Sequence, residues 1–166
     1  HKFPFFCVSI GLEYRNDLII GVVYDPEKGE LFHAESGKGA FLNRKRIYVS
    51  EVTSVKKALL ATGFAYNLKQ ARNKNINNFI KLLKASQAIR RAGSAALDLC
   101  YVACGRFDGF WELNLNPWDT AAGVVILKEA QGRVSALNGK KFNLYGKELL
   151  SSNSKIHNQL VRILSE

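Results

Sequence analysis

Short runs of aromatic and β-branched residues, broken by turn-forming sequences, dominate the first third of the chain. The turn signals include Arg15-Asn16-Asp17 and the segment 25–29 (Asp-Pro-Glu-Lys-Gly). Such runs between such turns are typical of strands joined in an antiparallel meander. The predicted strands occupy residues 4–14, 18–24 and 30–35, with a further turn marked by Gly37, Gly39 and Asn43 and a short strand at 58–62.

Helical spacing replaces this pattern in the second half of the chain. Between residues 67 and 85, apolar residues recur at the i, i+3, i+4 and i+7 positions of one face, which predicts a helix. Those residues are Ile76, Phe79, Ile80 and Leu83. The segment from Gly93-Ser94 to Cys104 is apolar on nearly every side and predicts a buried helix.

The remaining pattern predicts shorter elements. They are strands at 87–90, 107–112 and 147–151, a short strand or loop from Val134, a helix at 117–130 with Gly132 as its C-cap residue, and a final helix capped by Ser154. Strands and helices mix without strict alternation, which favours α/β packing in the form of a layered α+β sandwich.

The length of 166 residues amounts to about one ordinary domain. We therefore expect a single domain, with an antiparallel sheet part over residues 1–62 and a mixed α/β part over 63–166. The chain contains no methionine and opens directly on an apolar run that resembles a buried strand. Our interpretation is that the domain is incomplete at its N-terminal side, the alternative being a trimmed tag and chance absence of methionine.

Composition excludes several classes of protein. The hydrophobic fraction of 47% and the charged fraction of 23% exclude a disordered chain, a collagen and a coiled coil. No apolar run approaches the length of a membrane span, and no secretory signal pattern opens the sequence. Three cysteines with no zinc-type pairing favour a reduced, cytoplasmic protein. The histidines His1, His33 and His157 lack metal-ligand spacing, and we expect them at the surface.

The net charge of +10 is unevenly distributed. Residues 36–97 hold thirteen Lys and Arg against one Glu, a local charge of +12. Such a basic band could attract nucleic acid or anionic substrates. The alternative is a solvated surface, because no aromatic-interleaved basic motif accompanies it.

Two carboxylates are candidates for chemistry. Glu112 lies at the end of a predicted strand, and Asp119 lies seven residues later at the start of a predicted helix. They could converge on one site at this edge, where carboxylate oxygens suit hard cations such as Mg²⁺. The alternatives are an ordinary helix N-cap for Asp119 and a surface charge for Glu112.

A second candidate is the segment 90–96 (Arg-Arg-Ala-Gly-Ser-Ala-Ala). Gly93 permits a tight turn, and the N–H groups that follow it at the helix N-terminus can bind an anion or a hydroxyl oxygen, with Arg90 adding charge. The alternative is ordinary capping by Ser94.

Taken together, these segments resemble the inositol monophosphatase family, and its bacterial branch in particular. Residues 118–123 (Trp-Asp-Thr-Ala-Ala-Gly) with 129–132 (Glu-Ala-Gln-Gly) resemble the family's second signature, Gln131 standing where glycine is usual. Residues 90–99 and 107–112 are similar to the bacterial branch. The opening residues 1–5 resemble the stretch directly after the family's first metal-binding signature, and the similarity continues over the whole chain.

The resemblance implies the C-terminal part of the sugar-phosphatase fold and a Mg²⁺-dependent phosphomonoesterase acting on inositol monophosphate or a related sugar phosphate. It makes Asp119 a metal ligand and catalytic residue that also contacts substrate. It assigns Gly93, Ser94 and Ala95 to the inositol ring, and Glu112 to the ring hydroxyls. Arg90 matches a position near the substrate or a subunit contact, in a family that is commonly dimeric.

The first signature and an upstream metal-binding glutamate are absent from the 166 residues. Because one aspartate cannot assemble a two-metal site, whose Mg²⁺ ions each demand near-octahedral oxygen ligation, we expect the chain as given to be inactive or nearly so. The alternative function is a catalytically silent basic protein that associates with RNA or the transcription machinery. We expect no membrane association, and the phosphate substrate stays open between inositol monophosphate and related sugar or nucleotide phosphates.

Overall fold

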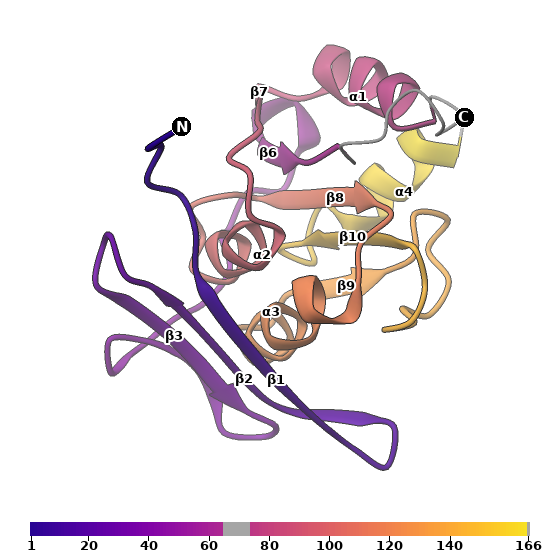
Figure 1. Ribbon diagram of the computed structural model, residues 1–166. Coiled ribbons are helices and arrows are strands. Elements are labelled where there is room, and N and C mark those ends of the chain that lie inside the picture. The colour runs from indigo at the N-terminus through magenta and orange to yellow at the C-terminus, as the bar shows by residue number, and fades with distance from the viewer. Residues whose placement is uncertain (65–73, 166) are drawn as a thin grey trace.

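The computed structural model describes residues 1–64 and 74–165, which form alternating layers of sheet and helix (Figure 1). The first sheet is an antiparallel meander in the order β1-β2-β3-β4-β5. Its strands are β1 (Val8–Tyr14), β2 (Asp17–Asp25), β3 (Glu30–Glu35), β4 (Gly39–Leu42) and β5 (Lys45–Arg46). The predicted meander is therefore confirmed, with Arg15 and Asn16 turning between β1 and β2 at positive φ.

The second sheet has the order β7-β6-β8-β10-β9. Its strands are β6 (Leu59–Thr62), β7 (Ala88–Arg90), β8 (Gly109–Leu113), β9 (Arg133–Ser135) and β10 (Glu148–Ser152). Strand β6 pairs in parallel with β7 and β8, whereas β10 pairs antiparallel with β8 and β9. Strand β8 is the central strand of this sheet and carries Glu112 near its end.

Four α-helices complete the layers. They are α1 (Lys74–Ala85), α2 (Ala95–Ala103), α3 (Pro117–Glu129) and α4 (His157–Ser165), with a short 3₁₀ turn at Val55–Lys57. Helices α2 and α3 lie between the two sheets, and α1 and α4 cover the outer face of the second sheet (Figure 1). The predicted layered α/β sandwich is confirmed.

Alternation along β8 separates two hydrophobic clusters. Phe110 belongs to the cluster between the sheets, and Trp111 belongs to the cluster beneath α1 and α4. Successive side chains of a strand point to opposite faces, so Glu112 shares the α2 side of the sheet with Phe110. Helix α3 sits unusually close to the first sheet, because a Cβ at Gly21 would lie 2.3 Å from the Ala122 carbonyl oxygen.

Some predicted boundaries differ from the structure. Residues 4–7 are not part of β1, and Phe3 and Phe6 are exposed. The segment expected to be only a turn, residues 37–43, contains β4, whose pairing with β3 is stabilised by two N–H groups donated to the Glu129 carboxylate of α3. Because Glu129 is about 90 residues away in sequence, the local pattern of residues 37–43 could not predict this contact.

The division of the chain at residue 62 also differs. Strand β6 lies within the predicted antiparallel part, yet it pairs in parallel with β7 and β8 of the second sheet. The antiparallel sheet ends at Arg46. The reason is that β6 is an apolar, buried strand, which suits the interior of a sheet covered on both faces.

Two caps differ from prediction. The C-cap of α3 is Ala130, and the next residue, Gln131, adopts φ +71°. The N–H of Gly132 donates to Leu127 O at 2.9 Å, so Gly132 follows the left-handed residue and is not itself the C-cap. Helix α4 is preceded by Asn153, whose side-chain oxygen accepts from the Ile156 N–H at 3.2 Å. Ser154 does not cap α4, because its hydroxyl donates to the Gln131 carbonyl.

Three other predictions concern a histidine, a helix and the membrane. His157 is fully buried rather than at the surface, because Ser135 and Ser152 hydrogen-bond both ring nitrogens. The predicted helix at 67–85 is present as α1 over its described part, and residues 67–73 lie outside the described residues. Among residues 1–64 and 74–165, no helix has both the length and the hydrophobicity needed to cross a membrane.

Candidate active site

The N-terminus of α2 is built on a glycine turn. Gly93 adopts φ +110°, a backbone conformation that strongly favours glycine, and Ser94 is the N-cap. The Ser94 hydroxyl accepts a hydrogen bond from the Leu97 N–H at 3.4 Å. Ordinary capping by Ser94 is thus present, and it leaves the N–H of Ala95, the first residue of the helix, outside the intrahelical ladder.

The N-terminus of α3 positions Asp119. Asn116 is the N-cap and Asp119 is the third helical residue, so Asp119 is not the plain N-cap considered from sequence. Its Oδ2 accepts from the Asn116 N–H at 2.8 Å. No hydrogen bond to Oδ1 comes from residues 1–64 or 74–165. One carboxylate oxygen therefore fixes the side chain, and the other is available to a ligand.

Strand β1 brings these two helix N-termini together. The Cys7 Sγ lies 3.5 Å from the Ser94 Oγ, and the Ser9 hydroxyl donates to the Trp118 carbonyl at 3.3 Å. Ser9 lies in β1 and Cys7 lies directly before it, so this short segment contacts both helix starts. The starts of α2 and α3 are therefore neighbours, and the positive ends of the two helix dipoles favour an anion between them.

Glu112 faces the same region from the end of β8. Burial raises its pKa to about 7, the negative charge of Asp119 adds to this rise, and Arg91 opposes it. A Cβ on Gly63 would lie 2.2 Å from the Glu112 Oε2, so only glycine permits this close approach. At neutral pH the Glu112 carboxyl is thus partly protonated and can both donate to and accept from a hydroxyl group.

Asp98 is a member of this group that the sequence analysis missed. Its side chain is 1% exposed, and its Oδ1 is buried without a hydrogen-bond partner among the described residues. Burial, followed by the nearby charge of Glu112, raises its pKa to about 8. An aspartate within an otherwise apolar helix was the available signal, because a buried acid without a counter-ion is costly.

The two adjacent arginines have different surroundings. Arg90 is exposed, and its Nη1 donates to the Ile89 carbonyl at 3.3 Å, so no contact joins it to Glu112 or Asp119. The guanidinium of Arg91 lies 5.4 Å from the Phe64 ring centre, and its charge lowers the Glu112 pKa. The cation that acts on Glu112 is therefore Arg91, and the expected role of Arg90 at the substrate or a subunit contact stays a prediction.

The predicted magnesium site requires several oxygen ligands close together. Within residues 1–64 and 74–165, no three His, Cys, Asp or Glu side chains are grouped so that they could hold a metal ion. Asp119 alone offers an oriented carboxylate oxygen, whereas Mg²⁺ needs near-octahedral oxygen ligation. The described residues do not by themselves fit a magnesium centre.

Comparison with known proteins agrees with this geometry. The family model described as inositol monophosphatase family matches residues 1–166. The inositol-1-monophosphatase of Synechocystis sp. is 47% identical over 99% of this chain and 58% of its own length. The Nus factor SuhB of Pseudomonas aeruginosa is 42% identical over 97% of this chain and 60% of its own length.

Solved structures agree as well. The inositol monophosphatase from Anabaena (Nostoc) sp. PCC 7120 superposes with a TM-score of 0.97 at 45% identity, covering 99% of this chain and 66% of that chain. The Thermotoga maritima IMPase TM1415 gives a TM-score of 0.90 at 36% identity, covering 99% and 63%. The chain thus spans about 60% of the length of the curated relatives it matches. The match of the family model to residues 1–166, together with these relatives, shows that the chain belongs to the inositol monophosphatase family.

Proposed function

We propose that the protein to which this chain belongs hydrolyses a phosphate monoester on inositol or a related polyol. The observation that carries this proposal is the convergence of two helix N-termini and Glu112 around β1. Anion-binding N–H groups suit a phosphoryl group, and a partly protonated carboxyl suits the hydroxyls of a polyol. The family assignment supports the same chemistry.

In this proposal the residues of the chain have separate roles. Gly93, Ser94 and Ala95 present backbone groups to the ring, and Glu112 orients ring hydroxyls. Asp119, held by its bond to the Asn116 N–H, directs its second oxygen at the reacting phosphate. Arg90, which is exposed, is proposed to reach substrate or a second subunit rather than Glu112.

Magnesium is part of the proposal as the family's cofactor. This chain would supply one ligand, Asp119, and the rest of the coordination is not found among the described residues. A divalent cation would neutralise phosphoryl charge and activate water.

Phosphate release from inositol 1-phosphate in the presence of Mg²⁺ tests the proposal. The expected result is hydrolysis by the full-length protein from its source and little or none by the 166-residue chain. In the full-length protein, Asp119→Asn should abolish turnover, and Glu112→Gln should weaken substrate affinity more than it lowers kcat. Fructose 1,6-bisphosphate and a nucleotide 3′-phosphate serve as comparison substrates. Equal rates on all three would contradict a polyol-selective site, and full activity of Asp119→Asn would contradict the role of Asp119.

A second candidate function is association with RNA or the transcription machinery. Its support is that relatives are called Nus factor SuhB and that the net charge is +10. The structure divides the basic band, however, because Lys38 to Arg46 belong to the first sheet, whereas α1 and β7 belong to the layers of the second. RNA binding that falls steeply between low and moderate salt would favour this function, and no binding at low salt would remove it.

A homodimer and a cytoplasmic location complete the proposal. The family resemblance supports a dimer, and the exposure of Arg90 is compatible with its proposed contact with a second subunit. The three cysteines are free thiols, which suits a reducing compartment. Sedimentation equilibrium of the full-length protein distinguishes monomer from dimer, and a monomer at micromolar concentration would contradict the first part.

A further inference from the structure

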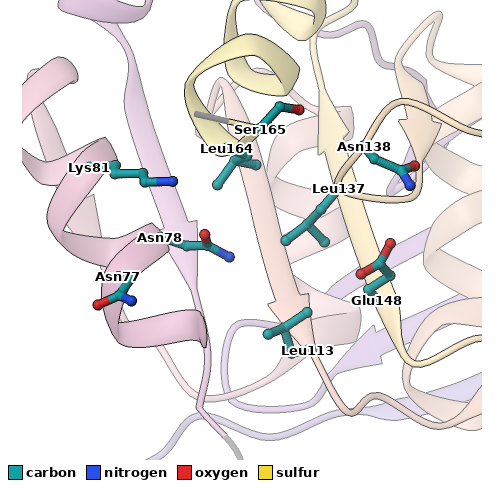
Figure 2. A pocket seen from close by; sticks show the side chains of 9 residues that line it. All are labelled: Asn77, Asn78, Lys81, Leu113, Leu137, Asn138, Glu148, Leu164 and Ser165. Atoms are coloured by element: carbon teal, nitrogen blue, oxygen red, sulfur yellow. The ribbon is translucent and has the colours of Figure 1, made fainter. Parts of the chain in front are cut away.

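A separate cavity lies on the outer side of the second sheet. Its volume is about 340 Å³, at the lower end of small-molecule sites. Helix α1 forms one wall, the segment after β9 and the start of β10 form the opposite wall, and the last turn of α4 closes the top (Figure 2). The cavity is therefore bounded by three elements that are distant in sequence.

This cavity is not the proposed active site. Its floor includes Leu113, which directly follows Glu112 on β8. Neighbouring side chains of a strand point to opposite faces, so Leu113 faces α1 and α4 while Glu112 faces α2. None of the residues assigned above to inositol or metal binding lines the cavity.

The charges of the cavity are arranged as a pair of opposite walls. Lys81 projects from α1, and Glu148 lies on the facing wall (Figure 2). Within residues 1–64 and 74–165, neither side chain forms an ion pair. The amide of Asn78, only 8% exposed, points into the space between them (Figure 2). A cation and an anion that do not neutralise each other can each bind an opposite charge.

Three leucines supply the apolar part of the lining. Leu113 comes from β8, Leu137 from the segment after β9 and Leu164 from α4 (Figure 2). The remaining lining residues, Asn77, Asn138 and Ser165, are polar and uncharged. The leucines favour a ligand with a short hydrocarbon part over a purely ionic ligand.

We propose that this cavity binds a free α-amino acid with an apolar side chain. The carboxylate of the ligand pairs with Lys81, its ammonium group pairs with Glu148, and its side chain lies on the three leucines. This site goes beyond the proposed phosphatase function and does not depend on it.

Isothermal titration calorimetry on the 166-residue chain tests the proposal with L-leucine, L-isoleucine and L-phenylalanine as probes. We expect dissociation constants of roughly 1 mM or below for at least one of them. Leucinamide lacks the carboxylate and N-acetyl-leucine lacks the ammonium group. Each should bind about tenfold more weakly, since a hydrogen bond to a charged group is worth more than 1 kcal/mol.

Variants identify the cavity as the place of binding. Lys81→Gln and Glu148→Gln should each weaken leucine binding about tenfold. Lys84→Gln on the same helix and Glu27→Gln on a remote turn are matched controls, because neither residue lines the cavity. Thermal unfolding of every variant checks that it is folded.

Three results would overturn the proposal. They are no binding of any probe up to about 10 mM, equal binding of leucine and its two analogues, or unchanged binding in both Lys81→Gln and Glu148→Gln. Because the readout is direct binding, failure here leaves the phosphatase proposal untouched, and loss of phosphatase activity leaves this one untouched.

Discussion

Polar side chains at the two ends of strand β8 differ in whether the chain supplies their hydrogen-bond partners. At its beginning, the Asp108 carboxylate accepts from the Leu59 N–H at 2.7 Å and from the Ser50 hydroxyl, and nearby His157 is held by Ser135 and Ser152. At its end, Glu112 has no hydrogen-bond partner among the described residues, and the same holds for one oxygen of Asp98.

This difference separates structural from functional polarity. A buried group with all of its hydrogen bonds made within the chain stabilises the fold, and its removal leaves its partners unsatisfied. A buried group left without partners costs stability and is retained where it can meet a ligand. Asp108 and His157 belong to the first class, and Asp98 belongs to the second. Glu112 is half-buried and resembles Asp98 in its raised pKa.

The largest change in stability is expected at the beginning of β8, where the Asp108 carboxylate accepts two hydrogen bonds. Asp108→Ala leaves the Leu59 N–H and the Ser50 hydroxyl without their acceptor, and should lower the free energy of unfolding by about 3 kcal/mol. Urea unfolding measures it. Asp108→Asn, which keeps one acceptor oxygen, should lose less, and Asp17→Ala at an exposed turn should change little. A loss below about 1 kcal/mol for Asp108→Ala would be inconsistent with a structural role.

The next effect has the opposite sign. Asp98→Asn removes a buried carboxyl whose pKa is raised to about 8, and should stabilise the protein by on the order of 2 kcal/mol at pH 8. Between pH 3.8 and 8, the unfolded carboxyl loses its proton while the folded one keeps it, so wild-type stability falls as pH rises. Below pH 4 the gain should vanish. Destabilisation by Asp98→Asn at pH 8 would show that Asp98 has a counter-ion.

His157 makes the stability of the protein depend on pH on the acid side. Burial lowers its pKa to about 4, with Arg133 adding to the effect. As pH falls from 6.5 to about 4, the His157 ring is protonated in the unfolded protein and stays neutral in the folded protein. The free energy of unfolding therefore falls. His157→Asn should cost about 1 kcal/mol at pH 7 and abolish this acid-side loss. The Asp98→Asn variant, in which the opposing slope is gone, is the background in which thermal melts should show it most clearly.

The smallest effect is expected at Glu112. Its pKa is raised to about 7, so Glu112→Gln should stabilise the fold by roughly half a kcal/mol above pH 7 and by nothing below pH 4.5. Thermal melts at pH 5 and pH 9 measure the difference. Unchanged stability at both pH values would mean that Glu112 is effectively solvated.

Most of the fold could be predicted from local pattern. The strands at 18–24 and 30–35 and the helix at 117–130 were found within a residue or two, because alternation and turn chemistry act locally. Strand β4 was missed because its four residues carry no alternation, and its N–H groups depend on Glu129, 90 residues away. The predicted boundary at residue 62 between the antiparallel part and the mixed part differs from the structure, because the residues of β6 alone do not show that it pairs in parallel with β7.

The candidate site was predicted in part. Glu112, Asp119 and the Gly93–Ser94 turn were identified because strand ends and helix starts have sequence signals. The roles of Arg91 and Cys7 were not, since they arise from proximity across the fold: Arg91 acts on Glu112, and Cys7 meets Ser94 from 87 residues away.

The family and the layered arrangement could be inferred without a structure, because motifs and hydrophobic period are properties of neighbouring residues. Which polar groups have hydrogen-bond partners could not. Burial, and the presence or absence of a partner within hydrogen-bond distance, depend on elements far apart in the chain. For that reason His157, expected at the surface, is a buried structural residue, and Asp98, unremarked in sequence, stands beside the candidate active site.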